Sequence, residues 1–181
     1  MMPDAAALGL DYSPTLPRRM DWRIGCVGAG FIMRDCHLVA YREAGFNPVA
    51  LTSRNLTTAR EVAQRHQIPQ VYASVEELLA DTSIEILDVA VPPAVQPAII
   101  LQAAQHKHLR GILAQKPLAM SVSEAKKCVE ACEKAGIVLA VNQNMRYDQS
   151  IRVMKQLLTR KALGDIILAT LDMRAIPHWM P

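Results

Sequence analysis

The sequence predicts an α/β fold, a doubly wound parallel β-sheet with helices on both faces. Two observations lead to this class. Strand-like apolar runs alternate with amphipathic runs in six successive units between residues 22 and 160. The run at 84–92 has a largely apolar second half, as expected for a central parallel strand covered on both faces. Repeated strand–helix units of this kind assemble into parallel sheets.

Each expected element has its own local signals. The predicted strands cover 22–27, 46–53, 70–73, 84–92, 110–115 and 137–143. The predicted helices cover 31–44, 56–66, 74–81, 95–105, 121–136 and 148–160. Gly45 and Gly136 are placed to end helices, and Ser74 with Glu77 has the spacing of a capping box. These signals agree with the periodicity on either side of them.

The two ends of the chain differ from this pattern. Residues 1–20 contain three prolines and show no periodicity, which indicates an extended or disordered segment. We assign 21–163 to the α/β domain. Residues 164–181 then begin a second, α+β domain with a strand at about 165–176, and we expect the chain to be part of a larger protein. A last edge strand on the same sheet is the alternative.

The composition and charge of the chain bear on which kinds of molecule it binds. The net charge is +3, from 20 basic and 17 acidic residues spread along the chain, which favours neither nucleic acid nor a membrane surface. No signal peptide is recognisable and no apolar run reaches about 18 residues, so we expect a cytoplasmic protein. The four cysteines form no CxxC pair; free thiols are favoured over a metal site, although zinc remains an alternative.

A glycine turn carries the first functional signal. Gly28 allows a tight turn after the first strand, and Gly30 lets the backbone approach a pyrophosphate. The helix that starts at Phe31 and Ile32 supplies free N–H groups. Met33 stands where a third glycine is expected, and we expect it to fill an apolar gap at the cost of a small helix displacement. The turn predicts a Rossmann-type dinucleotide site; a turn without a ligand is the alternative.

The end of the second strand suggests which dinucleotide binds. An acidic residue usually follows this strand and binds the ribose 2′-hydroxyl. Here Ser53 and Arg54 follow instead, and both can bind a 2′-phosphate. This favours NADP as the cofactor, with NAD as the alternative. Arg54 could also be a solvated loop charge, with Asn55 capping the next helix.

Three further motifs support a family resemblance. "VPPAVQ" follows the fourth strand, "AQKPLAM" the fifth and "AVNQNMRY" the sixth. With the glycine turn, they make residues 22–175 resemble the Gfo/Idh/MocA family of NAD(P)-dependent oxidoreductases. The resemblance implies hydride transfer between a nicotinamide cofactor and a sugar, polyol or related hydroxy or keto substrate.

The resemblance also implies residue roles. Lys116 would be the catalytic proton partner, because a hydroxyl losing hydride must also lose a proton. Gln115 stands where the family usually has Glu, and Gln96 where many members have His. The implied cofactor contacts are Pro92, Pro93, Gln96, Gln115 and Asn144, and the implied substrate contacts are Tyr147 and Arg146. Arg146 could instead be a structural ion-pair partner, and His37 is assigned to helix packing rather than catalysis.

The family implies a second domain that covers the cofactor, carries an Asp and a His that act with the lysine, and usually forms the oligomer interface. We therefore expect a homo-oligomer for the full-length form, and weak cofactor binding and poor catalysis by this chain alone. A non-catalytic NAD(P)-binding sensor of the same fold is the main alternative. A Rossmann domain for another ligand, such as a methyl donor, is a third.

Overall fold

The computed structural model describes residues 9–11 and 13–172. The chain falls into two compact units. One comprises Leu16–Gln143; the other joins the residues up to Thr15 with those from Asn144 onward. The sequence-based division ended the α/β domain at 163, whereas here the helix after the sixth strand groups with the N-terminal residues.

The larger unit is built on one parallel sheet. Its strands are β1 (Arg23–Val27), β2 (Asn47–Thr52), β3 (Gln70–Tyr72), β4 (Ile86–Val89), β5 (Gly111–Ala114) and β6 (Val138–Val141). The described strands pair in the order β3-β2-β1-β4-β5-β6, and every pair is parallel. The order reverses direction at β1, so a crevice opens beyond the carboxyl ends of β1 and β4. The doubly wound fold predicted from the sequence is confirmed.

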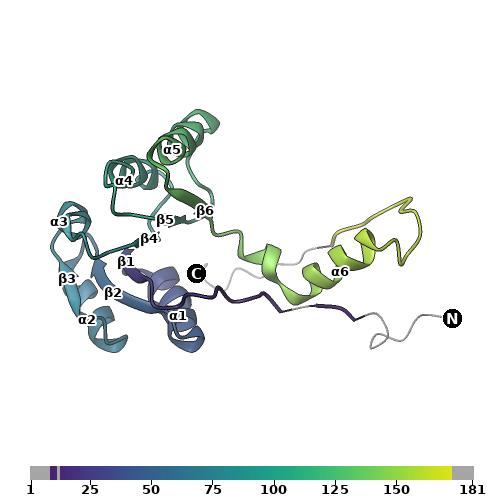
Figure 1. The fold of residues 1–181 in the computed structure, drawn as a ribbon, viewed down its shortest axis with the longest axis horizontal. Coiled ribbons are helices and arrows are strands. Elements are labelled where there is room, and N and C mark those ends of the chain that lie inside the picture. Colours follow the sequence, from purple (N-terminus) through teal and green to yellow (C-terminus); the bar gives the residue numbers. More distant parts are fainter. Residues whose placement is uncertain (1–8, 12, 173–181) are drawn as a thin grey trace. The chain divides into compact units, whose positions relative to one another are not determined.

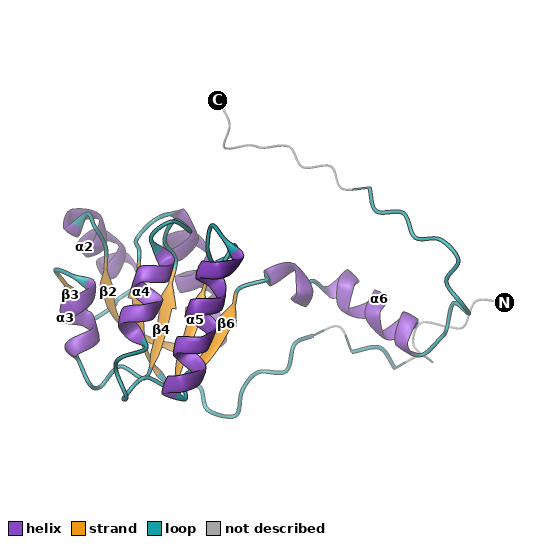
Figure 2. Ribbon diagram, turned by 90° about the horizontal axis from the view of Figure 1, so that it is seen from above, coloured by secondary structure: helices purple, strands orange, loops and turns teal. Residues whose placement is uncertain are grey.

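Helices cover both faces of this sheet. The π-helix η2 (Ile32–His37) runs into α1 (Leu38–Ala44); the others are α2 (Leu56–Arg65), α3 (Val75–Ala80), α4 (Gln96–Ala103) and α5 (Val122–Ala135). One core cluster packs α3, α4 and α5 on one face, and a second packs η2, α1 and α2 on the other (Figures 1 and 2). Along β1, alternate residues belong to opposite clusters, as the two-residue period of a strand requires.

The helix ends confirm the capping signals. Ser74 Oγ accepts a hydrogen bond from the Glu77 N–H at 3.1 Å, at the start of α3. Gly45 and Gly136 adopt the left-handed conformation that ends α1 and α5. These contacts fix the start of α3 and the ends of α1 and α5.

Met33 fills the core, as expected from the missing third glycine. Its side chain is fully buried in the cluster between β1, η2 and α2. The first helix starts as a π-helix: the Leu38 N–H donates to the Met33 carbonyl, five residues back, instead of four. The expected single α-helix over 31–44 therefore begins with a wider turn next to this large side chain.

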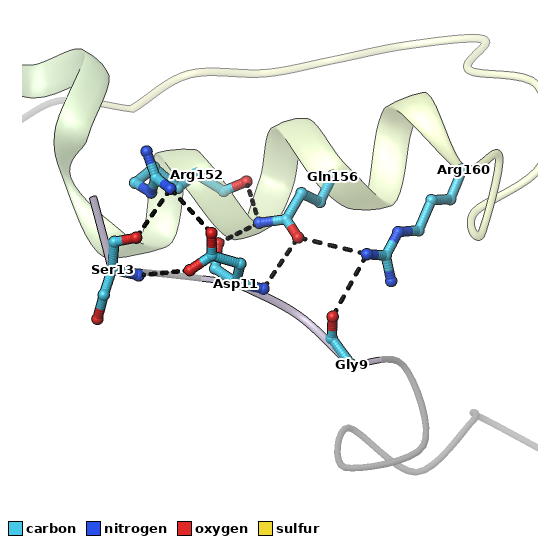
Figure 3. A network of polar contacts seen from close by, with 6 residues as sticks. All are labelled: Gly9, Asp11, Ser13, Arg152, Gln156 and Arg160. Carbon is cyan, nitrogen blue, oxygen red and sulfur yellow. Dashed lines mark hydrogen bonds and ion pairs between the residues drawn. The ribbon is translucent and has the colours of Figure 1, made fainter. Parts of the chain in front are cut away.

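The smaller unit holds the 3₁₀ helix η3 (Asn144–Tyr147), helix α6 (Gln149–Thr159) and an extended N-terminal segment. The segment is bound along α6 by polar contacts (Figure 3). Gln156 Oε1 accepts from the Asp11 N–H at 3.0 Å, and Arg152 donates to the Ser13 carbonyl at 3.0 Å. The N-terminal segment, predicted to be extended or disordered, is thus held against α6 at Asp11 and Ser13.

The strand expected at about 165–176 is not formed over its described part. Residues 165–172 have no regular secondary structure, and Ile167 and Leu168 are almost fully exposed. A strand needs a neighbour to bind its N–H and C=O groups, and these residues pair with no described strand. Residues 173–176 lie outside the described part.

Candidate functional site

The crevice at the switch point is a cleft of about 500 Å³. It is lined by the turns after β1, β2 and β4 and by parts of the β3–α3 loop and α4. Five of the predicted cofactor residues line it: Gly28, Gly30, Ser53, Arg54 and Pro92. The fold therefore gathers residues from three separate loops into one hollow.

The two glycines of the turn are needed for different reasons. Gly28 has φ of +105°, and a Cβ there would lie 2.3 Å from the Ala90 carbonyl oxygen. Its N–H donates to the Thr52 carbonyl at 2.8 Å, which ties the turn to the end of β2. At Gly30 a Cβ would meet nothing within 4 Å. Packing thus requires glycine at position 28, whereas position 30 leaves open space.

That open space fits a dinucleotide phosphate. The first N–H groups of a helix have no intrahelical partner, and they carry partial positive charge. Phe31 and Ile32 lie at this helix start, with exposed side chains. A phosphate above Gly30 would meet the N–H donors of the helix start, and no side chain at position 30 would block it. With Met33 in place, the turn therefore keeps the open space and the helix start that the predicted phosphate site requires.

At the end of β2, where the sequence predicts the ribose contact, the described cleft residues include no carboxylate, neither Asp nor Glu. Ser53 is half-buried and Arg54 exposed, directly after β2. Asn55 caps α2, because its Oδ1 accepts from the Thr58 N–H at 3.1 Å. Asn55 thus has the capping role foreseen for it, and Ser53 and Arg54 remain beside the cleft.

Gln96 binds the Lys116 loop rather than lining the cleft. Its side chain is fully buried, and its Oε1 accepts from the Gln115 N–H at 2.8 Å. Its Nε2 lies 2.8, 2.9 and 3.2 Å from the carbonyl oxygens of Gln115, Leu118 and Pro117. All these contacts are to backbone. One buried amide therefore ties together the loop between β5 and α5.

This loop presents Lys116 to solvent. Lys116 is exposed, and the Lys116–Pro117 peptide bond is cis. The Gln115 side chain is half-buried, and its Nε2 lies 2.7 Å from His37 Nε2. Neither Lys116 nor Gln115 lines the cleft, and neither does Pro93. The lysine lies beyond the end of β5, at the same edge of the sheet as the cleft.

A buried polar network lies beneath the loop, and the sequence reasoning missed it. Asp88, on β4, is fully buried and accepts at Oδ2 from His37 Nδ1 and from the Tyr41 hydroxyl, each at 2.7 Å. Asn142 Nδ2 lies 2.8 Å from His37 Nε2. Burial, and then the Asp88 charge, raise the pKa of both the Tyr41 hydroxyl and the Cys26 thiol. The one available signal was an Asp inside the apolar run "ILDVAV".

The remaining predicted residues lie in the smaller unit. Asn144, Arg146 and Tyr147 are exposed on η3. Arg146 and Tyr147 line a hollow of about 560 Å³ within that unit, together with Asp11, Ile151, Arg152, Lys155 and Gln156. These three predicted contacts therefore belong to the smaller unit.

Two other classes of site find no support over residues 9–11 and 13–172. No group of three or more His, Cys, Asp or Glu side chains there is arranged to hold a metal ion. No helix in that part of the chain is both long and apolar enough to cross a membrane.

Known proteins resemble the chain in sequence and fold. It is 29% identical over 153 residues to a mouse trans-1,2-dihydrobenzene-1,2-diol dehydrogenase, and 30% identical over 141 residues to a D-apiose dehydrogenase of Paraburkholderia graminis. These matches take in 83% and 76% of this chain, but only 45% and 36% of the two enzymes. The chain thus spans less than half the length of these relatives.

A solved structure has a similar fold. An oxidoreductase from Agrobacterium radiobacter, in complex with NAD⁺, L-tartaric acid and magnesium, superimposes with a TM-score of 0.75 at 29% identity. The match covers 80% of this chain and 42% of that one. The profile of the oxidoreductase family with an NAD-binding Rossmann fold, GFO_IDH_MocA, matches residues 22–143. Over the sheet, the glycine turn and the Lys116 loop, the chain is therefore a member of the Gfo/Idh/MocA oxidoreductase family.

Proposed function

We propose that this chain supplies the cofactor-binding part of an NAD(P)-dependent oxidoreductase. The enzyme would move hydride between the nicotinamide ring and a sugar, polyol or related hydroxy or keto substrate. The observation that carries the proposal is the open space at Gly30 over the start of η2, beside a cleft at the switch point of the sheet. Dehydrogenases of a diol and of apiose among the relatives support the substrate class.

Lys116 is the proposed proton partner. Hydride leaves or joins carbon, so the oxygen on that carbon must lose or gain a proton, and an ammonium group at the oxygen serves both directions. Lys116 is exposed, on a loop whose backbone is bound by buried Gln96. Support for this role is the fixed position of the loop at the edge of the sheet where the cleft opens.

NADP is the proposed preferred cofactor. Support comes from Ser53 and Arg54 beside the cleft and from the lack of a carboxylate among its described lining residues. A hydroxyl and a guanidinium suit a 2′-phosphate, whereas the 2′-hydroxyl of NAD is usually bound by Asp or Glu. The solved relative named above contains NAD⁺, so the two cofactors must be compared directly.

The residues of η3 complete the proposal. Asn144 would contact the cofactor, and Tyr147 and Arg146 the substrate, in the longer protein. Its substrate domain would begin within residues 164–181, and its assembly would be a homo-oligomer. The three residue assignments rest on the Asn-x-Arg-Tyr motif and on the exposure of all three side chains. The domain and the oligomer are proposed from the family resemblance alone.

The test compares the turnover of the wild-type protein with that of the Lys116→Met variant. The chain, and a longer native form if one is expressed, would be incubated with NAD⁺ or NADP⁺ and a set of sugars and polyols while reduced cofactor is followed by absorbance. We expect turnover by the longer form and little by the chain alone. Lys116→Met should abolish this turnover and keep cofactor binding. Turnover that survives Lys116→Met would contradict the role of the lysine. Cofactor binding without turnover by the longest form would instead favour a sensor.

A further inference from the structure

His37 has more polar contacts than helix packing requires. It is buried, and both ring nitrogens have partners: Nδ1 donates to Asp88, and Nε2 lies within 2.8 Å of the side-chain amides of Gln115 and Asn142. The three partners come from β4, from the β5–α5 loop and from the residue directly after β6. A residue that only filled space would need none of them.

Asp88 and Tyr41 fix the orientation of this ring. A buried carboxylate is costly unless donors surround it. Asp88 Oδ2 accepts from both His37 and Tyr41 at 2.7 Å, while its Oδ1 has no described partner. His37 and Tyr41 also pack edge to face, with ring centroids 6.2 Å apart. The imidazole is therefore held on one side, and its Nε2 is directed at the β5–α5 loop.

Gln115 is consequently held from two directions. Its backbone N–H and carbonyl are bound by Gln96, which reaches the loop from α4. Its side chain is bound by His37, which reaches the loop from η2 on the opposite face of the sheet. Lys116 is the next residue along the chain. Any rotation of the Gln115 peptide would have to break contacts on both sides.

We propose that His37 is a positioning residue for Lys116: its ring, held by Asp88 and Tyr41, binds the Gln115 side chain and so sets the conformation of the loop that presents the lysine. The inference rests on the proposed function only for the catalytic role of Lys116. The loop conformation can be tested without cofactor, substrate or turnover.

The test measures how fast Lys116 is acylated by an N-hydroxysuccinimide ester, read by peptide mass spectrometry. Lys126, exposed on α5, is the internal reference. Gln115→Ala removes the link at the loop. Because removing one member of a buried pair would leave the other unpaired, the network is removed as a set, with His37→Leu, Tyr41→Phe and Asp88→Leu together. His66→Phe, at another buried histidine, is the matched control.

We expect Gln115→Ala and the triple replacement each to change the normalised rate by about threefold or more, in the same direction. Combining them should add nothing, because both break the same link. His66→Phe should leave the rate unchanged. An unchanged rate in the triple variant, or effects that multiply in the combined one, would overturn the inference. Since the assay contains no cofactor, failure of the proposed function would be seen separately, in the turnover test.

Discussion

The glycine turn and the Lys116 loop lie at the same edge of one sheet, but different parts of the chain determine their shapes. The turn is shaped by backbone: Gly28 has a positive φ, and a Cβ there would collide with the Ala90 carbonyl oxygen, so only glycine fits. The loop is shaped by side chains, since Gln96 and His37 hold it from opposite faces of the sheet. A local motif can specify the turn; the loop needs residues far apart in the sequence.

This difference predicts which substitutions destabilise each region. The turn should be intolerant of any added atom at one position and indifferent at the next glycine. The loop should lose stability only when a buried polar side chain is removed.

The largest expected effect is at Gly28. Gly28→Ala combines a strained φ with a Cβ 2.3 Å from a backbone oxygen, and should cost about 4 kcal/mol of unfolding free energy. Gly30→Ala, with nothing within 4 Å of the new Cβ, should cost less than about 0.5 kcal/mol. Urea unfolding of both variants would check this. Equal losses would show that the turn is not specified by the contact at Gly28.

Met33→Gly would restore the third glycine of the motif, yet it should destabilise the protein. The methionine side chain is fully buried between β1, η2 and α2. Its removal leaves a cavity and adds a flexible residue to a helix, at a cost of about 3 kcal/mol. Thermal unfolding is the measurement. A more stable Met33→Gly variant would show that the wide first turn of η2 is strained by the methionine.

Gln96→Ala tests the loop side. It removes a buried amide that binds one backbone N–H and three carbonyls, and the loss should be about 2 kcal/mol. Gln102→Ala, on the same helix, serves as the control, because the Gln102 side chain is partly exposed and has no hydrogen-bond partner among the described residues. Urea unfolding should separate the two variants. If they lose the same stability, Gln96 does not hold the loop.

The smallest effect is expected at His66, a buried histidine outside both regions. Burial lowers the pKa of His66 below its ordinary value of 6.5, partly offset by the backbone of Arg34. Below that value the unfolded chain binds more protons than the folded one, so stability is full above pH 6.5 and falls as the pH drops. His66→Phe should flatten this slope, measured by urea unfolding at about pH 5 and about pH 8. An unchanged slope would assign it to other groups, such as His108, whose pKa burial also lowers.

Much of the fold follows from the sequence because its signals are local. Alternating apolar runs, the Ser74 cap and the glycine stops gave the strand and helix order, and a doubly wound sheet follows from that order. The burial of Met33 was also foreseen. The strand expected at about 165–176 is not formed over its described residues. A strand needs a neighbouring strand to pair with, and the local sequence does not show whether one is present.

The candidate site also has residues that the local sequence predicts and residues that it does not. Gly28, Gly30, Ser53 and Arg54 follow strands directly, so their place at the cleft could be predicted. Gln96 was expected at the cofactor, but its buried amide is bound to the Lys116 loop. Such pairing depends on residues that the chain brings together only on folding. The network around Asp88 could not be read from spacing for the same reason.

Calorimetric titration with NADH and with NADPH tests the cleft most directly, using the wild type, Gly30→Ala and Arg54→Ala. We expect both cofactors to bind, NADPH more tightly. Gly30→Ala should weaken both without unfolding the protein, and Arg54→Ala should weaken NADPH alone. No binding of either cofactor, or binding that Gly30→Ala leaves unchanged, would contradict the claim that the cleft at the glycine turn is a working dinucleotide site.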